Sequence, residues 1–384
     1  MQRPPASPLD GKLQALEARL SPLLFWAGFL WFQFGLQHDI AQATFGDADR
    51  YGSRALQMHL MLLAWVGAAF ALHFLACRPG LRAWPVAATP AWTVLPVLLL
   101  GAIATGARFP HVFVQGGWLA WPLLVVLHVA MLRRLDAAPP ERWWRVVHAG
   151  GVGLAVLLGG NLLLHAVRSA ELGRTAWAAV ILLTAGTAVL LVLCLPAVHA
   201  ARPSRWPLDR YARSYAWMAG LPLAMAVAFG ALVAAVTSSG NARPLPYVPL
   251  LNPTDLAVAL ALAACALWLL RLERGAHAAL AEPLRQPARI ALGVLAFVAV
   301  NTVWLRTVHH YAGVPWEQRA LFHSFLVQAG FSILWTLLAL GLMLAAFRAA
   351  SRRTWLTGAG LLGVTVAKLF LVDLSNRGAG KVPA

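Results

Sequence analysis

The sequence predicts an all-α fold, a polytopic bundle of about eleven transmembrane helices. Apolar residues make up 60% of the 384 residues and charged residues only 12%, whereas a soluble chain carries about 25% charged residues. The apolar residues gather in eleven stretches, nearly all bounded by arginines. A stretch such as 325–347 is about as long as the roughly 20 residues of helix that cross a hydrocarbon core. Because lipid offers no hydrogen bonds, such stretches can satisfy their backbone only as helices.

The connections between these stretches are short, so consecutive helices are expected to run antiparallel. The predicted spans are residues 20–37, 57–77, 83–106, 112–132, 146–167, 175–200, 214–239, 253–270, 287–305, 325–347 and 354–372. Residues 20–372 then form the transmembrane domain. Residues 1–19 are a cytoplasmic amino-terminal segment, in which 11–20 are expected to form a short surface helix, and residues 373–384 are a carboxyl-terminal tail.

The basic residues predict the orientation of the bundle. The amino terminus and the loops after even-numbered spans carry 20 lysines and arginines, against 10 on the opposite side, with Lys368 inside the last span. This excess places the amino terminus in the cytoplasm and, with eleven spans, the carboxyl terminus outside. Ala41-Gln42-Ala43 resembles a signal-peptidase site. The bulky aromatic residues of the first span, with Asp10 and Glu17 before it, favour an uncleaved helix.

Composition and motifs exclude several function classes. The net charge of +17 is spread singly or in small groups between apolar runs, which indicates topology signals and no nucleic-acid partner. The three cysteines lie in or at the end of apolar stretches without metal-ligand spacing, so no metal or cofactor is predicted. The glycines at 150–153 lie inside a span, where they favour close helix packing over dinucleotide binding.

The connection between the seventh and eighth spans is the most distinctive segment. Prolines at 244, 246, 249 and 253 hold it extended. Asn252 is placed as an N-cap, with Pro253 at the first helical position and Asp255 at the third. This capping role explains both polar residues without a function. The alternative is that the rigid loop returns into the outer leaflet and forms the wall of a site.

There are two further groups of polar residues. One follows the ninth span, and the other lies at the end of the eleventh. Adjacent histidines on a helix point about 100° apart, so His309 and His310 do not form a two-ligand metal face. Lys368 and Asp373 are five residues apart and do not make an i,i+4 pair. Lys368 either snorkels to the membrane boundary or pairs across the bundle, with Asp255 or another acid on the outer side as the expected partner.

Under the predicted orientation these groups share the outer side of the membrane. Because ionisable groups in lipid need partners or water, we expect them to converge on one polar cavity. No catalytic residue can be assigned. The candidate outer-side cluster is Asn252, Asp255, Arg306, His309, His310, Lys368 and Asp373.

Several strings resemble one bacterial family. LPYVPLLNPTDL (245–256), GWLAWPLLVVLH (117–128), KLFLVDLSNRG (368–378) and the segment 306–335 are similar to the predicted membrane proteins that contain domain of unknown function 2339. The resemblance implies a many-span inner-membrane protein, with this chain as the carboxyl-terminal part of a longer member and with a truncated tail. It implies no activity, because none is established for the family.

Three classes of function follow. The first is a non-catalytic or envelope-associated membrane protein with a polar cavity that opens to the outer side. The second is a membrane enzyme or transferase acting on envelope lipid or glycan ligands, in which the outer charges supply acid–base chemistry. The third is a transporter or flippase, which predicts internal repeats; no convincing repeat relates the two halves of the sequence. Membrane lipids are the expected partners, and the sequence leaves the oligomeric state open.

Overall fold

A computed structural model describes residues 8–44, 50–76, 85–135, 142–194, 206–207, 211–274 and 278–373. These residues form twelve α-helices with short 3-10 and π-helical segments, and the described ranges contain no strand. The predicted all-α class is therefore confirmed. The helices belong to two compact units, Met1–Ser169 with Pro203–Ala219, and Ala170–Arg202 with Gly220–Ala384.

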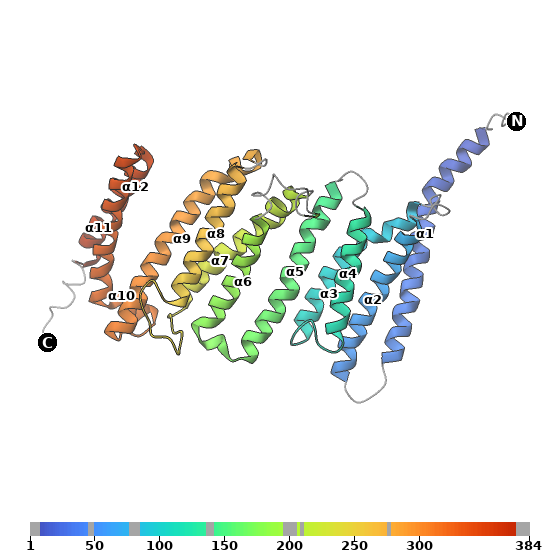
Figure 1. The fold of residues 1–384 in the computed structure, drawn as a ribbon, viewed down its shortest axis with the longest axis horizontal. Helices are drawn as coiled ribbons and strands as arrows, with labels where there is room; N and C mark the ends of the chain where they lie inside the picture. The colour runs from blue at the N-terminus through green and yellow to red at the C-terminus, as the bar shows by residue number, and fades with distance from the viewer. Residues whose placement is uncertain are drawn as a thin grey trace. The chain divides into compact units, whose positions relative to one another are not determined.

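The first unit is organised around α2. Its elements are α1 (Pro8–Thr44), α2 (Arg50–Ala76), the 3-10 helix η1 (Pro85–Thr93), α3 (Val94–Arg108), α4 (Gly117–Leu135), α5 (Arg142–Ser169) and the π-helix η4 (Ser214–Ala219). Helix α2 contacts α1, η1, α3 and α4, while α5 packs on α3 and η4 (Figure 1).

Helix α1 differs from the prediction for the amino-terminal segment. The surface helix expected at 11–20 is helical, but it continues without a break through the first span to Thr44. Pro22 lies inside this 37-residue helix. A proline removes one backbone hydrogen bond, and here it does not end the helix. The segment and the first span are therefore one element.

The second unit is organised around α8. Its elements are η2 (Leu172–Arg174), α6 (Ala176–Cys194), α7 (Gly220–Thr237), α8 (Pro253–Arg274), α9 (Ala278–Ala312), α10 (Gln318–His323), α11 (Phe325–Arg348), α12 (Arg352–Lys368) and the π-helix η5 (Leu369–Asp373). Helix α8 packs against α6, α7 and α9, and α9 also contacts α7 and α11 (Figure 1). Helix α12 pairs with α11.

The helices have the length and the surface of membrane spans. Among the described residues, nine helical segments are long and apolar enough to cross a membrane, and α1 and α4 occupy the other two predicted spans. Large apolar side chains such as Trp31, Leu119 and Phe347 are exposed along these helices. Exposed apolar surface on this scale is stable against hydrocarbon and unstable against water. The protein is a polytopic membrane protein.

Candidate functional site

The proline-rich loop at 238–252 connects α7 to α8, and its last residue caps the amino end of α8. The amide of Thr254 donates to Asn252 Oδ1 at 2.9 Å, and the amide of Leu256 donates to the carbonyl of Asn252 at 3.0 Å. The predicted N-cap is confirmed. Asn252 is buried, and its Nδ2 donates to the carbonyl of Gly240 at 2.8 Å. The same side chain therefore starts the helix and folds the loop back on itself.

A buried ion pair joins α9 to the first turn of α8. Arg306 Nη1 donates to Asp255 Oδ1 at 2.6 Å, and the two side chains are 1% and 3% exposed. Asp255 lies in the first turn of α8, where the helix dipole favours a negative charge. A charge of this burial is tolerated only with a partner and further hydrogen bonds.

Arg306 supplies those further bonds by capping the carboxyl end of α7. Its Nε donates to the carbonyl of Ser238 at 3.0 Å, and Nη2 donates to that of Ala235 at 2.6 Å. The last carbonyls of a helix have no partner inside the helix and carry its negative dipole end. One guanidinium therefore holds the end of α7, the start of α8 and the body of α9 together.

Gly240 allows the loop to approach this guanidinium. Its φ of +79° is unfavourable for other residues. A Cβ built there would lie 3.0 Å from Arg306 Cδ and 3.2 Å from a ring carbon of Tyr247. The turn thus needs glycine for its backbone conformation and for the space around it.

The ring of Tyr247 lies flat on the ring of His310. Their centroids are 4.4 Å apart with an interplanar angle of 11°. Tyr247 donates from its hydroxyl to the carbonyl of Val303, and His310 Nε2 donates to the carbonyl of Ser239 at 2.9 Å. Burial raises the pKa of the Tyr247 hydroxyl, so it stays neutral. This stack fastens the loop along the last turns of α9.

His309 serves a different contact from its neighbour. Its Nδ1 donates to the carbonyl of Val314 at 2.7 Å, which closes the turn after α9. Trp316, in the same turn, donates to the carbonyl of Thr237 at the end of α7. The adjacent histidines therefore point to separate partners, and the described residues contain no group of three or more histidine, cysteine or acidic side chains arranged for a metal ion.

Lys368 is bound within the pair formed by α11 and α12. Its Nζ donates to the carbonyl of Gln328 at 2.7 Å and to the hydroxyl of Ser332 at 2.9 Å, both on α11. The expected pairing with Asp255 is wrong, because Arg306 binds that carboxylate. Asp373 ends η5, and its side chain and the tail from 374 to 384 lie outside the described residues.

In the first unit, side chains of neighbouring helices also hold a helix-connecting loop in place. The sequence did not reveal this set of contacts, which we call the clamp of the first unit. Residues 109–116 connect α3 to α4, and the amide of Val112 donates to Asn161 Oδ1 of α5 at 2.8 Å. The carbonyl of Val112 accepts from His59 Nε2 at 3.1 Å and from Trp121 Nε1 at 2.9 Å.

A contact between two rings accompanies these bonds, as it does in the second unit, but here the rings are tilted by 42°. The ring of His111 in the loop packs on that of His165 near the end of α5, with centroids 4.4 Å apart. Each unit therefore has a Pro-aromatic-Val string in a helix-connecting loop, at 110–112 and at 246–248. The aromatic ring of each string contacts a histidine near the carboxyl end of α5 or of α9, respectively. The short shared string was the available signal, but it is too brief to indicate a repeat without the contacts.

Comparison with known proteins agrees with this architecture. A family model described as a predicted membrane protein (DUF2339) matches residues 15–379. No curated protein and no solved structure matches the chain. The match confirms the resemblance carried by the proline-rich loop and the segment at 368–378. Since it covers nearly the whole of the 384 residues, the chain belongs to this family of predicted membrane proteins.

Proposed function

We propose that the protein is a non-catalytic scaffold of the bacterial cytoplasmic membrane, with its amino terminus in the cytoplasm. The observation that carries this proposal is that each of the three guanidinium nitrogens of Arg306 has a protein acceptor. Its Nε, Nη1 and Nη2 all donate to protein acceptors, and the side chain is almost wholly buried. Each nitrogen of this buried guanidinium is engaged by the protein, whereas a catalytic or transport residue must meet its ligand.

The other members of the cluster support the same function. Asn252 is buried with both ends of its amide bonded, and His310 is occupied by a carbonyl and a ring. We propose that this end of the second unit faces the periplasm and presents the proline-rich loop as a rigid platform. The polar cavity expected from the sequence would then be replaced by a closed polar core beneath the platform.

A surface for envelope partners remains above this core. Leu245, Leu250, Leu251 and Tyr311 are exposed on the loop and at the end of α9. In a scaffold these side chains supply contacts with membrane lipid or with an envelope component. The catalytic alternative, a transferase acting on envelope lipid or glycan, instead requires the buried charges to become accessible.

Apolar replacement of the ion pair tests the proposal. In Asp255→Leu/Arg306→Met the pair is replaced by side chains of similar volume, which is often neutral or stabilising for structural pairs. A scaffold should keep its abundance in the membrane and should complement a deletion strain as the wild type does. If the double variant accumulates normally but fails to complement, the charges are needed for chemistry or transport, and the scaffold proposal is wrong.

A further inference from the structure

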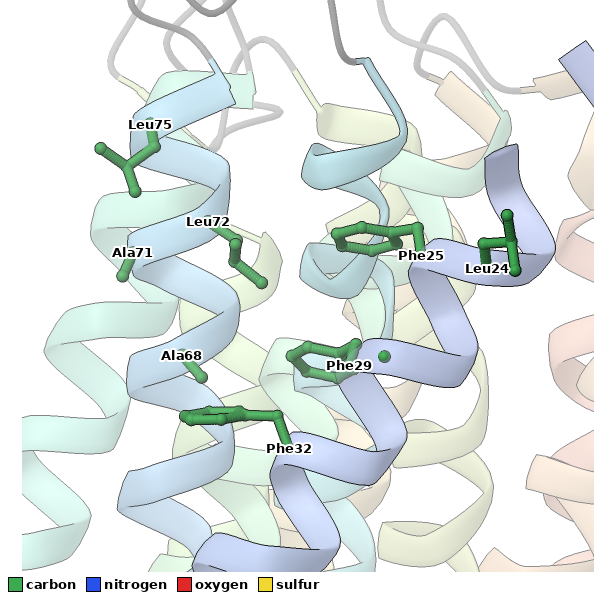
Figure 2. A pocket seen from close by; sticks show the side chains of 9 residues that line it. Leu24, Phe25, Phe29, Phe32, Ala68, Ala71, Leu72 and Leu75 are labelled. Carbon is green, nitrogen blue, oxygen red and sulfur yellow. The ribbon is translucent and has the colours of Figure 1, made fainter. Parts of the chain in front are cut away.

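An open apolar groove lies between α1 and α2 of the first unit. It has a volume of about 550 Å³ and is lined by Leu24, Phe25, Gly28, Phe29, Phe32, Ala68, Ala71, Leu72 and Leu75. Figure 2 shows the three phenylalanine rings extending from α1 toward α2, opposite Ala68 and Leu72. The lining contains no charged or hydrogen-bonding side chain, so the group that fills the groove is hydrocarbon.

The floor of the groove is rigid and its rim is open. Phe25 and Phe29 are buried and lie parallel, with centroids 6.3 Å apart, and Phe29 meets Trp65 of α2 edge to face. At the rim, Leu24 and Phe32 are exposed. The floor packs on η1 through Ala87. The groove is therefore held in shape from behind and is accessible from the bilayer.

The volume of the groove and the charge of a residue near one end of it indicate its occupant. Small-ligand pockets typically measure about 300–1,000 Å³, and this groove lies within that range, along about two turns of α1. Arg19 lies on α1 five residues before Leu24. Basic residues at the cytoplasmic boundary attract anionic lipid.

We propose that this groove binds one acyl chain of an anionic phospholipid, whose headgroup lies beside Arg19. The headgroup part of this inference rests on the proposed orientation, which places the Arg19 end in the cytoplasmic leaflet. The groove itself does not depend on the scaffold function. Bound lipid stabilises the contact between α1 and α2 by filling space that the protein side chains leave open.

The chain offers a matched pair of glycines for the test. A Cβ at Gly28 or at Gly35 would meet no atom within 4 Å, and both glycines belong to α1. Only Gly28 lines the groove. Gly28→Leu therefore fills the groove, and Gly35→Leu adds the same side chain to the same helix elsewhere. Both substitutions replace glycine by a better helix former.

Native mass spectrometry of the detergent-solubilised protein measures binding of phosphatidylglycerol and of phosphatidylethanolamine. Gly28→Leu should weaken phosphatidylglycerol binding about tenfold, the loss expected when about two methylene groups leave the groove. Gly35→Leu should bind as the wild type does, and Arg19→Gln should lose the preference for phosphatidylglycerol.

Three results would overturn this proposal. Equal binding by Gly28→Leu and wild type would exclude the groove as the lipid site. An unchanged lipid preference in Arg19→Gln would exclude the headgroup contact. A wild-type dimer that Gly28→Leu converts to a monomer would identify a second copy of the chain as the occupant. If the topology proves to be reversed but Gly28→Leu still weakens lipid binding, the acyl-chain site is supported and only the proposed orientation is wrong.

Discussion

Arg306 on α9 and Asp255 on α8 form an ion pair that also closes the carboxyl end of α7. The 2.6 Å contact between Nη1 and Oδ1 neutralises both charges, while Nε and Nη2 bind carbonyls at the end of α7. The pair therefore fixes three helices at the point where the proline-rich loop leaves them. Its main effect is on geometry, because burying an ion pair adds little net stability but losing one partner is expensive.

Removal of one partner should destabilise the second unit strongly. Arg306→Met leaves the carboxylate of Asp255 buried without its cation, and such changes cost about 3–5 kcal/mol. Denaturant unfolding in detergent micelles should show this loss, and Asp255→Leu should partly reverse it in the double variant. Arg319→Gln, at an exposed arginine of α10, should change stability by less than about 0.5 kcal/mol. If the stability lost in the double variant equals the sum of the losses in Arg306→Met and Asp255→Leu, the two residues do not form a pair.

Substitution of Gly240 should be more harmful than substitution of another glycine with positive φ. Gly240 and Gly313 have φ of +79° and +69°, so alanine introduces backbone strain of about 1–3 kcal/mol at either place. Only at Gly240 does the new Cβ also meet Arg306 and Tyr247, whereas at Gly313 it meets nothing within 4 Å. The melting temperature of Gly240→Ala should therefore be lower than that of Gly313→Ala. An equal loss would show that the loop can move away from the guanidinium.

The sequence predicted the elements of this structure more completely than their contacts. Long apolar runs have one stable form in lipid, so the existence and type of the helices followed directly. The cap at Asn252 also followed, because it depends on neighbours in the chain. The short helix α10, which holds the turn between α9 and α11, was missed because its six residues carry no apolar span.

The partners of the polar residues could not be predicted in the same way. In a membrane protein the lipid-facing and buried faces of a helix are both apolar, so the pattern does not show which face meets a neighbour. Two acceptors of Lys368 illustrate this, because one is a backbone carbonyl and the other is a serine, both on α11. Neither acceptor is acidic, so a search for opposite charges selected Asp255 instead.

Loss of Lys368 should have a moderate effect. Its ammonium donates to neutral acceptors on α11, and hydrogen bonds to charged groups contribute about 1.5–3 kcal/mol. Lys368→Met should lower stability by about that amount, and the loss should shrink when Ser332→Ala is already present. Double-variant melting in detergent measures this coupling. A fully neutral Lys368→Met would show that the lysine snorkels to the membrane surface in the folded protein.

The basic residues predict a specific topology. Reporter fusions after Arg142, at the start of α5, and after Gly240, between α7 and α8, should give cytoplasmic and external signals respectively. The two sites are separated by α5, α6 and α7, so an odd number of crossings must place them on opposite sides. The reverse pattern would refute the cytoplasmic amino terminus, and equal signals would require one of these helices not to span.

The clamp of the first unit should be sensitive to acid. The amide of Phe113 donates to His111 Nδ1 at 3.2 Å, a bond that protonation of Nδ1 removes. Burial lowers the pKa of His111, and the neighbouring His165 lowers it further. Because the folded pKa lies below the unfolded value of about 6.5, the unfolded form binds more protons between the two values. This stabilisation is therefore present above about pH 6.5 and is lost as the pH falls through the folded pKa.

The second unit has Tyr247 at the position analogous to His111, so His111→Tyr is the matched control for this behaviour. Hydrogen exchange of residues 109–116 should become faster at pH 5 than at pH 7.5 after correction for the intrinsic rates. His111→Tyr should keep a ring on His165 and abolish the acid response of the first loop. If that variant retains the response, the titrating group is elsewhere and the contact of His111 with His165 is only a packing contact.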